Sequence, residues 1–321
     1  MINISDKLKY KLNMLPMKPG VYKMIDARGN IIYVGKSKLL KRRVKTYFSS
    51  NPKWDKVNRM VKVIDDIEFI VTDTHMEARL LECSLIKSVK PVFNSQMKHD
   101  RGYVYLKLED YNKYRALSII ESREGNTFTF GPFRSRSQLN ETINILKNLY
   151  PIKSAAKSYS FDFHLFPAAL NEADFNENRN SLYEILTDNS KAKMFIKELS
   201  NKMKNEASFY NFEMAAIYKE IIINVNYIFY SINKNYELSK SNLITSIPVE
   251  NGYKLFYISK GIILKKEISE KPFPDNIEAF TEAALTPLDS VIHMDEKSLV
   301  DYKDIVCSEI ISSSEIAVKY I

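Results

Sequence analysis

Two short apolar segments separated by a polar turn lie near the start of the chain. Gly20-Val21-Tyr22 lies in the first segment and Tyr33-Val34-Gly35 in the second. Residues 26–30 between them are polar and contain a glycine. Apolar runs of this length joined by turn residues predict a β-hairpin that presents two tyrosines.

The pattern after the hairpin is helical and basic. Ser37 is a candidate N-cap for a helix that ends near Phe48, with Leu40 and Val44 on its apolar stripe. Apolar residues at helical spacing predict a second helix over 56–65. Alternating residues then predict a strand that reaches Val71.

A capping-box pattern opens the next predicted helix. Thr74 and Glu77 have the required spacing, and the helix is expected to run to about Val89. Glu82 lies in its mainly apolar stripe. It is either a helix-edge residue whose stem covers the core, or an inward carboxylate that needs a metal or a basic partner.

The remaining chain alternates between strand and helix patterns. We expect a polar, irregular stretch at 151–188 and an antiparallel helical hairpin from Ser190 with its turn at 209–211. The other patterns predict strands over 103–108, 116–120, 127–130, 243–249, 254–259 and 262–268, and helices over 137–149 and 277–285.

Composition is typical of a globular protein of about two domains. The chain has 321 residues, of which 45% are hydrophobic and 27% charged. No apolar run approaches the roughly 18 residues of a membrane span, and no secretory signal is visible. Cys83 and Cys307 are few and far apart, which argues against a disulfide framework and predicts a cytoplasmic protein.

Charge is concentrated in the first hundred residues. They hold 20 Lys and Arg against 10 Asp and Glu, a net of +10, whereas the whole chain is +8. The other 221 residues therefore net −2. A basic N-terminal domain on a near-neutral remainder predicts a polyanionic partner for that domain.

Four stretches taken in order resemble the GIY-YIG nuclease superfamily. They are LPMKPGVYKM, NIIYVGKSKLLKRRVKTYF, EARLLECSLIK and PVFN. Within the superfamily they resemble the N-terminal half of the UvrC family of the bacterial excinuclease ABC system, and its short relative Cho. GPFRS and LKNLYPIKS continue this resemblance. Residues 199–221 resemble the family's UVR motif, a helical hairpin that docks on UvrB, the helicase-like component of the same excinuclease.

The resemblance implies an endodeoxyribonuclease that hydrolyses a phosphodiester bond. The implied site residues are Tyr22, Tyr33, Lys36, Arg43, Tyr47 and Asn94, with Glu82 holding one Mg²⁺ (or Mn²⁺) ion. Tyr33 is the candidate general base or water-positioning phenol, with Lys36 lowering its pKa. Contacts to the DNA backbone are expected from Lys38, Lys41, Arg42, Lys45, Lys53 and Lys56. Contacts to UvrB are expected from Leu199, Met203, Phe212, Glu213 and Ala216.

The expected fold class is α+β. It comprises a small GIY-YIG domain with a short mixed or antiparallel sheet flanked by helices, an α+β region with a UVR-like hairpin, and a C-terminal β-rich segment. The expected divisions are a nuclease domain at 1–98, a β-rich extension and helix at 99–155, a linker at 156–189, the UVR-like hairpin at 190–235 and an α+β segment of open role at 240–321.

Two departures from the UvrC pattern narrow the expected function. The family's cysteine-rich stretch would fall at 150–190, where there is no cysteine, so no iron–sulfur cluster is expected. The chain also ends before the family's RNase H-like nuclease, so we expect one nuclease centre. Asp289, His293, Asp295, Asp301 and Asp304 are expected to lie in loops and on the surface rather than to bind a metal.

The predicted function is a single incision in damaged double-stranded DNA, 3′ to a lesion, in nucleotide excision repair directed by UvrB. Two alternatives remain open. One is a free-standing GIY-YIG endonuclease of homing or restriction type. The other is a non-catalytic adaptor that binds UvrB.

Overall fold

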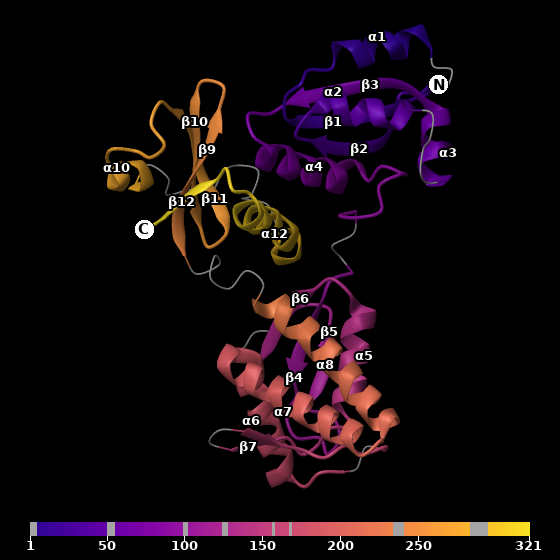
Figure 1. The fold of residues 1–321 in the computed structure, drawn as a ribbon, viewed down its shortest axis with the longest axis vertical. Helices are drawn as coiled ribbons and strands as arrows, with labels where there is room; N and C mark the ends of the chain where they lie inside the picture. The colour runs from indigo at the N-terminus through magenta and orange to yellow at the C-terminus, as the bar shows by residue number, and fades with distance from the viewer. Residues whose placement is uncertain are drawn as a thin grey trace. The chain divides into compact units, whose positions relative to one another are not determined.

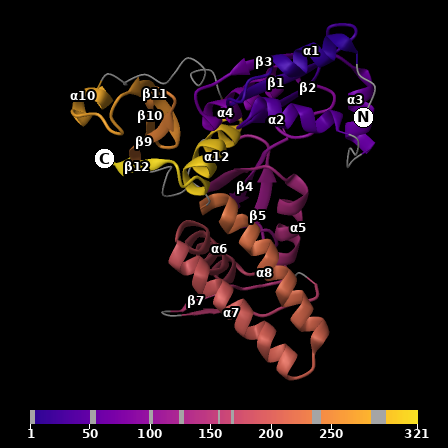
Figure 2. The ribbon, with the colours of Figure 1, turned by 45° about the horizontal axis from the view of Figure 1, so that its top comes forward.

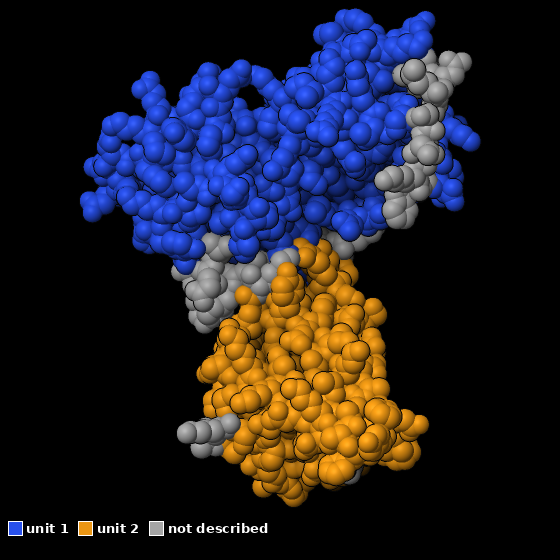
Figure 3. Space-filling view, viewed as in Figure 1, with its two compact units in different colours: residues 1–100, 237–321 blue, residues 101–236 orange. Residues whose placement is uncertain are grey.

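The chain divides into two units, coloured separately in Figure 3. The computed structural model describes residues 5–49, 55–98, 102–123, 128–155, 158–166, 169–233, 241–282 and 295–321. Unit 1 consists of residues 1–100 and 237–321, and unit 2 of residues 101–236. Unit 1 is therefore assembled from the two ends of the sequence, with unit 2 inserted between them.

A three-stranded antiparallel sheet forms the N-terminal part of unit 1 (Figure 1). Its strand order is β2-β1-β3, which makes β2 an edge strand. The predicted hairpin is β1 and β2. The elements are α1 (Asp6–Met14), β1 (Gly20–Asp26), β2 (Ile31–Ser37), α2 (Leu40–Lys45), a 3₁₀ turn (Thr46–Phe48), α3 (Asp55–Val63), β3 (Ile64–Val71) and α4 (His75–Val89).

The two faces of this sheet carry separate apolar clusters. On one face Val21 and Val34 pack against Ala78 and Ile86 of α4. The other cluster contains Leu8, Tyr22, Met24, Leu40 and Val44, so α1 and α2 contribute to it. The sheet is thereby held between α4 and the helices α1 and α2.

Helix starts differ in how well their caps were predicted. The Thr74–Glu77 capping box at α4 is confirmed, with both reciprocal hydrogen bonds present. The prediction that Ser37 caps the next helix is wrong. Ser37 is the last residue of β2, its Oγ accepts from the amide of Leu39, and α2 begins only at Leu40.

The C-terminal part of unit 1 is a second antiparallel sheet in the order β11-β10-β9-β12. Strands β9, β10 and β11 confirm the predicted β segment. Helix α12 and strand β12 were not predicted, and residues 283–285 of the expected helix lie outside the described residues. The elements are β9 (Asn242–Val249), β10 (Gly252–Ser259), β11 (Ile262–Ser269), α10 (Ile277–Glu282), α12 (Glu296–Ser312) and β12 (Ala317–Tyr320).

The described residues of unit 2 form a three-stranded sheet in the order β5-β4-β6, a small β7-β8 hairpin and four helices. Helices α7 and α8 lie side by side in Figures 1 and 2 and form the predicted helical hairpin. The elements are β4 (Val104–Leu108), β5 (Leu117–Ile120), β6 (Thr129–Phe133), α5 (Arg136–Leu146), β7 (Lys153–Ala155), β8 (Ser158–Ser160), α6 (Glu172–Thr187), α7 (Asn189–Ser208) and α8 (Phe212–Asn233).

The expectation of an irregular linker at 156–189 is wrong. Most of this stretch is β8 and α6, and α6 buries Phe175, Leu182 and Ile185. One apolar cluster includes Leu106 of β4, Leu139 of α5, Leu182 of α6, Phe195 of α7 and Ile221 of α8. The β-rich extension, the supposed linker and the UVR-like hairpin therefore share one core.

Among the described residues, none of the helices is both long and apolar enough to cross a bilayer.

Candidate active site

Three tyrosines from three elements meet beside the hairpin. The hydroxyl of Tyr22 in β1 lies 2.9 Å from that of Tyr47, and Tyr47 donates to the hydroxyl of Tyr33 in β2 at 3.3 Å. Their ring centroids are 6.0–6.1 Å apart in every pair. Tyr22 is 1% exposed, whereas Tyr33 remains partly open to solvent.

The glycines of the two triplets leave room for this arrangement. Tyr22 is paired with Gly35 across the hairpin, and a Cβ added at Gly35 would lie 2.4 Å from the Tyr22 hydroxyl oxygen. A Cβ at Gly20 would lie 2.2 Å from the carbonyl oxygen of Ile70 in the paired strand β3. Both contacts are too short for any side chain.

Arg43 reaches the tyrosine cluster from α2. Its Nη2 donates to the Tyr47 hydroxyl at 3.2 Å, and its guanidinium carbon lies 5.0 Å from the Tyr47 ring centroid. The rest of the side chain is exposed. Arg43 can therefore hold the cluster and still present donors to an anion, as a planar guanidinium does for a phosphate.

The free edge of β2 is covered by side chains and a loop. Asn94 accepts from the Val34 amide at 2.9 Å and donates to the Val34 carbonyl at 2.8 Å, while the Phe93 amide donates to the Ile32 carbonyl. Glu82 Oε1 accepts from the Lys36 amide at 3.1 Å. The edge groups that an unpaired strand would leave open are thus used to position Asn94 and Glu82.

Glu82 is mostly buried and faces Lys36. Its Oε2 lies 3.6 Å from Lys36 Nζ. Burial raises the pKa of Glu82, and the Lys36 ammonium and amide oppose that rise. The second sequence interpretation, an inward carboxylate with a basic partner, is confirmed by this geometry.

The expected lowering of the Tyr33 pKa is wrong for the arrangement seen here. Burial raises the pKa of Tyr33 above its usual value, and the neighbouring Tyr47 and the charge of Glu82 raise it further. Burial likewise raises the pKa of Tyr22. The Lys36 ammonium faces the Glu82 carboxylate instead of acting on the phenol. Tyr33 is therefore a protonated phenol at neutral pH.

Comparison with known families agrees with this geometry. The family of UvrC-like GIY-YIG domains matches residues 18–95. This part of the chain belongs to that family. All the candidate site residues described above, from Tyr22 to Asn94, lie inside the matched range.

Similar proteins extend the likeness beyond the GIY-YIG domain. UvrABC system protein C of Clostridium tetani is 35% identical over 240 residues, covering 68% of this chain and 38% of that protein. The Streptococcus agalactiae protein of that name is 29% identical over 282 residues, covering 84% and 47%. The GIY-YIG N-terminal endonuclease domain of UvrC from Thermotoga maritima, described as bound to magnesium, is 37% identical, with a TM-score of 0.27, over 29% of this chain and all of that one. The chain spans less than half the length of the two UvrABC system proteins.

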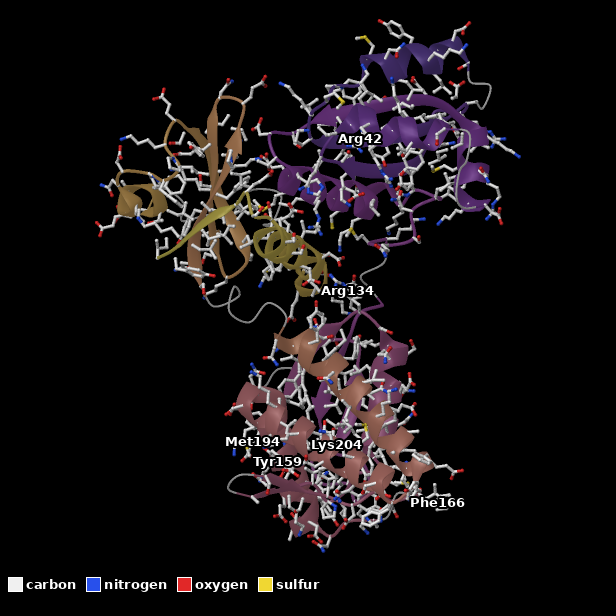
Figure 4. The ribbon with its side chains drawn as sticks, viewed as in Figure 1. Arg42, Arg134, Tyr159, Phe166, Met194 and Lys204 are labelled. Atoms are coloured by element: carbon white, nitrogen blue, oxygen red, sulfur yellow. The ribbon has the colours of Figure 1, made fainter. Side chains whose placement is uncertain are left out.

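The basic residues predicted to contact DNA are only partly free to do so. Lys38, Arg42 and Lys45 are exposed at and beside α2 of the GIY-YIG domain, where Figure 4 labels Arg42. Lys41 donates to the Asn13 carbonyl at 3.0 Å, and Lys56 donates to Ser95 Oγ at 3.4 Å. Lys53 lies outside the described residues.

The residues predicted to contact UvrB divide into two groups. Phe212, Glu213 and Ala216 are exposed near the start of α8, and Met203 is half-buried. The prediction for Leu199 is wrong, because its side chain is 0% exposed in the core of unit 2. A position in the apolar stripe of the hairpin faces the core here and not a partner.

Two exposed aromatic residues at the hairpin turn were missed. Phe209 is 79% exposed and Tyr210 is 82% exposed, and the Tyr210 ring lies edge-on to Phe212 at 6.2 Å. The sequence signal was a cluster of aromatic residues at a predicted turn, where solvent exposure is expected. The expected surface placement is wrong for Asp301 and Asp304, which are buried in α12, whereas Asp295 is exposed at the start of that helix. Asp289 and His293 lie outside the described residues. Among the described residues no group of three or more His, Cys, Asp or Glu could hold a metal ion.

Proposed function

We propose that this chain is a DNA endonuclease of nucleotide excision repair that makes one metal-dependent incision, on the 3′ side of a lesion, directed by UvrB. One observation carries the proposal: three hydrogen-bonded tyrosines, Arg43 and the buried Glu82 meet around one hairpin of a UvrC-like GIY-YIG domain. Such a set can bind a phosphate, position a water and hold a cation. Such a nuclease would act in the cytoplasm.

Glu82 is the residue that fits a divalent cation. It is a single inward carboxylate, and one carboxylate completed by waters and phosphate oxygens is an ordinary environment for Mg²⁺. The Thermotoga maritima domain is described as bound to magnesium, which supports the same ion here. When bound, the cation would supply positive charge beside the scissile phosphate. The Lys36 amide, which donates to Oε1, would hold the Glu82 carboxylate in place.

Tyr33 is assigned to positioning the attacking water. It is the most accessible of the three phenols, and Tyr47 already donates to its hydroxyl. The Tyr33 proton is therefore free to be donated elsewhere. Because its pKa is raised, the phenol orients a water through hydrogen bonds, and it would act as a base only with a cation nearby. Tyr22 and Tyr47 keep the Tyr33 hydroxyl in position through the hydrogen bonds that link the three phenols.

Arg43 and the exposed basic residues are assigned to the substrate backbone. The Arg43 guanidinium uses one nitrogen on Tyr47 and retains further donors for the scissile phosphate. Lys38, Arg42 and Lys45 would bind neighbouring phosphates without reading sequence. Asn94 contacts only backbone in the described structure and is assigned to holding the edge of β2.

The role of UvrB is supported by the hairpin and by the relatives. The turn between α7 and α8 exposes Phe209, Tyr210 and Phe212, a set suited to burial against a protein partner. Two relatives that match more than two thirds of this chain are each named UvrABC system protein C. We therefore assign the hairpin turn to docking on UvrB.

The deciding experiment combines the chain with a duplex carrying one lesion, Mg²⁺ and UvrB, and maps each cut to a nucleotide. The proposal requires one nick 3′ to the lesion that depends on both Mg²⁺ and UvrB. Equal cutting of damaged and undamaged duplex without UvrB would instead identify a free-standing endonuclease. Binding to UvrB with no cutting would identify an adaptor.

A further inference from the structure

We propose that the described C-terminal residues, 241–282 and 295–321, form a brace that positions the helix carrying Glu82. Within unit 1, α4 lies between the β1–β2 hairpin and the C-terminal elements. One face packs on the β1–β2 hairpin, and another face packs on α12 and the C-terminal sheet. The effect on nicking rests on the proposed function, whereas the effect on α4 itself does not.

The apolar part of the brace is built on residues of α4 that face away from the hairpin. Met76 is buried in a cluster with Phe256 of β10 and with Tyr302 and Val306 of α12, and Leu80 packs against it. Ala78 and Ile86 face the hairpin instead. Each side of α4 therefore has its own apolar partner, and Glu82 lies on the hairpin side.

Polar contacts hold the first turn of α4. Glu309 of α12 accepts from Arg79 Nη1 at 2.8 Å, and its Oε1 lies 3.0 Å from His75 Nδ1. Arg79 Nη1 also donates to Ser308 Oγ at 2.9 Å. Because the Glu309 carboxylate is mostly buried, these charge-assisted contacts are shielded from solvent and fix direction as well as distance.

A second ion pair holds the other end of the same helix. Lys87 Nζ lies 2.9 Å from Asp301 Oδ2, and Asp301 is 2% exposed. His75 and Lys87 are twelve residues apart, which corresponds to about 18 Å along a helix. Glu82 lies between these anchors. Two separated anchors restrain both sliding and rotation of α4, and neither movement would leave Glu82 opposite the Lys36 amide.

The middle of the brace is not filled by apolar side chains. A cavity of about 410 Å³ opens between α4 and the C-terminal sheet, lined in part by Leu80, Leu81 and Phe256. Ion pairs span its rim: Lys254 to Asp73 at 2.7 Å and Lys266 to Glu77 at 3.1 Å. Directional polar contacts therefore act together with the apolar cluster around Met76 in setting where α4 lies. Single charged residues of α12, such as Glu309 and Asp301, can therefore be tested as residues that position α4.

The test compares Glu309→Gln and Lys87→Met with Glu315→Gln, an exposed carboxylate of the same segment, all in the full chain. In Glu309→Gln and in Lys87→Met, amide hydrogen exchange over 79–89 is expected to speed up roughly tenfold relative to wild type, with exchange in α1 and β1 unchanged. In nicking, the Mg²⁺ concentration for half-maximal rate is expected to rise roughly three- to tenfold, with DNA affinity unchanged. Glu315→Gln is expected to match wild type in both.

Unchanged exchange over 79–89 in both variants would overturn the brace. Acceleration spread equally over α1 and β1 would also overturn it, because that result reports general loss of stability. Having two variants guards against a failure of one to fold. A wild-type chain that does not nick DNA would refute the proposed function, while the exchange comparison would still decide the brace.

Discussion

Glu82 is the residue whose replacement separates binding from cleavage. Glu82→Gln keeps the side-chain volume and an oxygen for the Lys36 amide, and removes only the charge that would attract a cation. We expect Mg²⁺-dependent nicking to be lost and affinity for lesion DNA to stay within a few fold. Gel-based nicking and binding assays check this. Glu68→Gln, at an exposed carboxylate of β3, is the control. Cutting at the wild-type rate by Glu82→Gln would remove the metal assignment.

Gly35 offers a steric test of the tyrosine cluster. A methyl group at this position meets the Tyr22 hydroxyl, so Gly35→Ala must displace a ring that is almost fully buried. We expect a loss of about 1–3 kcal/mol in unfolding free energy and a large fall in nicking rate. Gly102→Ala is the control, because nothing lies within 4 Å of the added atom. Thermal melting and nicking rates that leave the two variants alike would contradict the close approach.

Residue identities at the site were predictable, but their electrostatics were not. Tyr22, Tyr33, Glu82 and Asn94 were expected from the resemblance to GIY-YIG nucleases, because each lies in one of the four matching stretches. The direction of the Tyr33 pKa depends on burial and on where the Lys36 ammonium points. Neither quantity is encoded in local sequence, so the prediction of a lowered pKa was wrong.

The α7–α8 hairpin should separate a docking turn from a structural stem. Tyr210→Ser with Phe212→Ser removes exposed aromatic area, so we expect weaker binding to UvrB with an unchanged melting temperature. Leu199→Ala should instead cost about 2–5 kcal/mol of stability, because it opens a cavity in the unit 2 core. Calorimetric titration and melting measure the two effects. Phe166→Ser, at another exposed aromatic residue of unit 2, is the binding control. An equal loss of UvrB affinity in this variant would refute docking of UvrB on the α7–α8 turn.

The contact between α4 and α12 should weaken in acid. His75 and Arg79 lower the pKa of Glu309 to about 2 against the effect of burial, from a usual value of 4.5. A lowered carboxyl pKa stabilises the fold fully above 4.5 and progressively less as pH falls toward 2. At pH 7 we expect Glu309→Gln to be less stable than wild type by about 1 kcal/mol, because solvent screens part of the interaction with His75 and Arg79. Urea unfolding at several pH values checks this, and a gap that stays constant down to pH 2.5 would contradict it.

Elements with a strong local sequence signal were predicted well, whereas helices with few apolar residues were not. The hairpin, the α4 capping box and strands β9 to β11 each carry a local signal. Helices α1, α6 and α12 are rich in polar residues and bury only a few apolar side chains. Their stability comes from packing against distant elements, which explains why α6 resembled a linker in the sequence.

Charge on the whole molecule should govern DNA affinity. Lys38, Arg42 and Lys45 are exposed within the basic first hundred residues. Each phosphate contact contributes about 0.9 to the slope of log affinity against log salt concentration. Replacing all three by Gln should lower that slope by up to about 3. Lys193, Lys197 and Lys204 of α7, replaced in the same way, are the control. Salt titrations of binding check both, and equal slopes in the two triple variants would refute this DNA contact surface.

The pairing of the two chain ends in unit 1 had no sequence signal. Residues 240–321 looked like a separate segment, yet Arg79 and Glu309 are 230 positions apart and share a hydrogen bond. Local propensity predicts helices and strands, whereas such pairing depends on which apolar face remains uncovered after each element forms. Met76 and Leu80 belong to that remaining face of α4.

This arrangement has a consequence for the order of synthesis. Helix α4 leaves the ribosome about 200 residues before α12, and at roughly 5–20 residues per second the interval is about 10–40 s. Throughout that interval residues 1–89 have been synthesised while Met76 and Leu80 lack their apolar partners in β10 and α12. A chain interrupted in unit 2 would carry the exposed basic residues of α2, but the helix that carries Glu82 would be unbraced. If the brace acts as proposed, nicking by such a chain would need a higher Mg²⁺ concentration than nicking by a chain that includes α12.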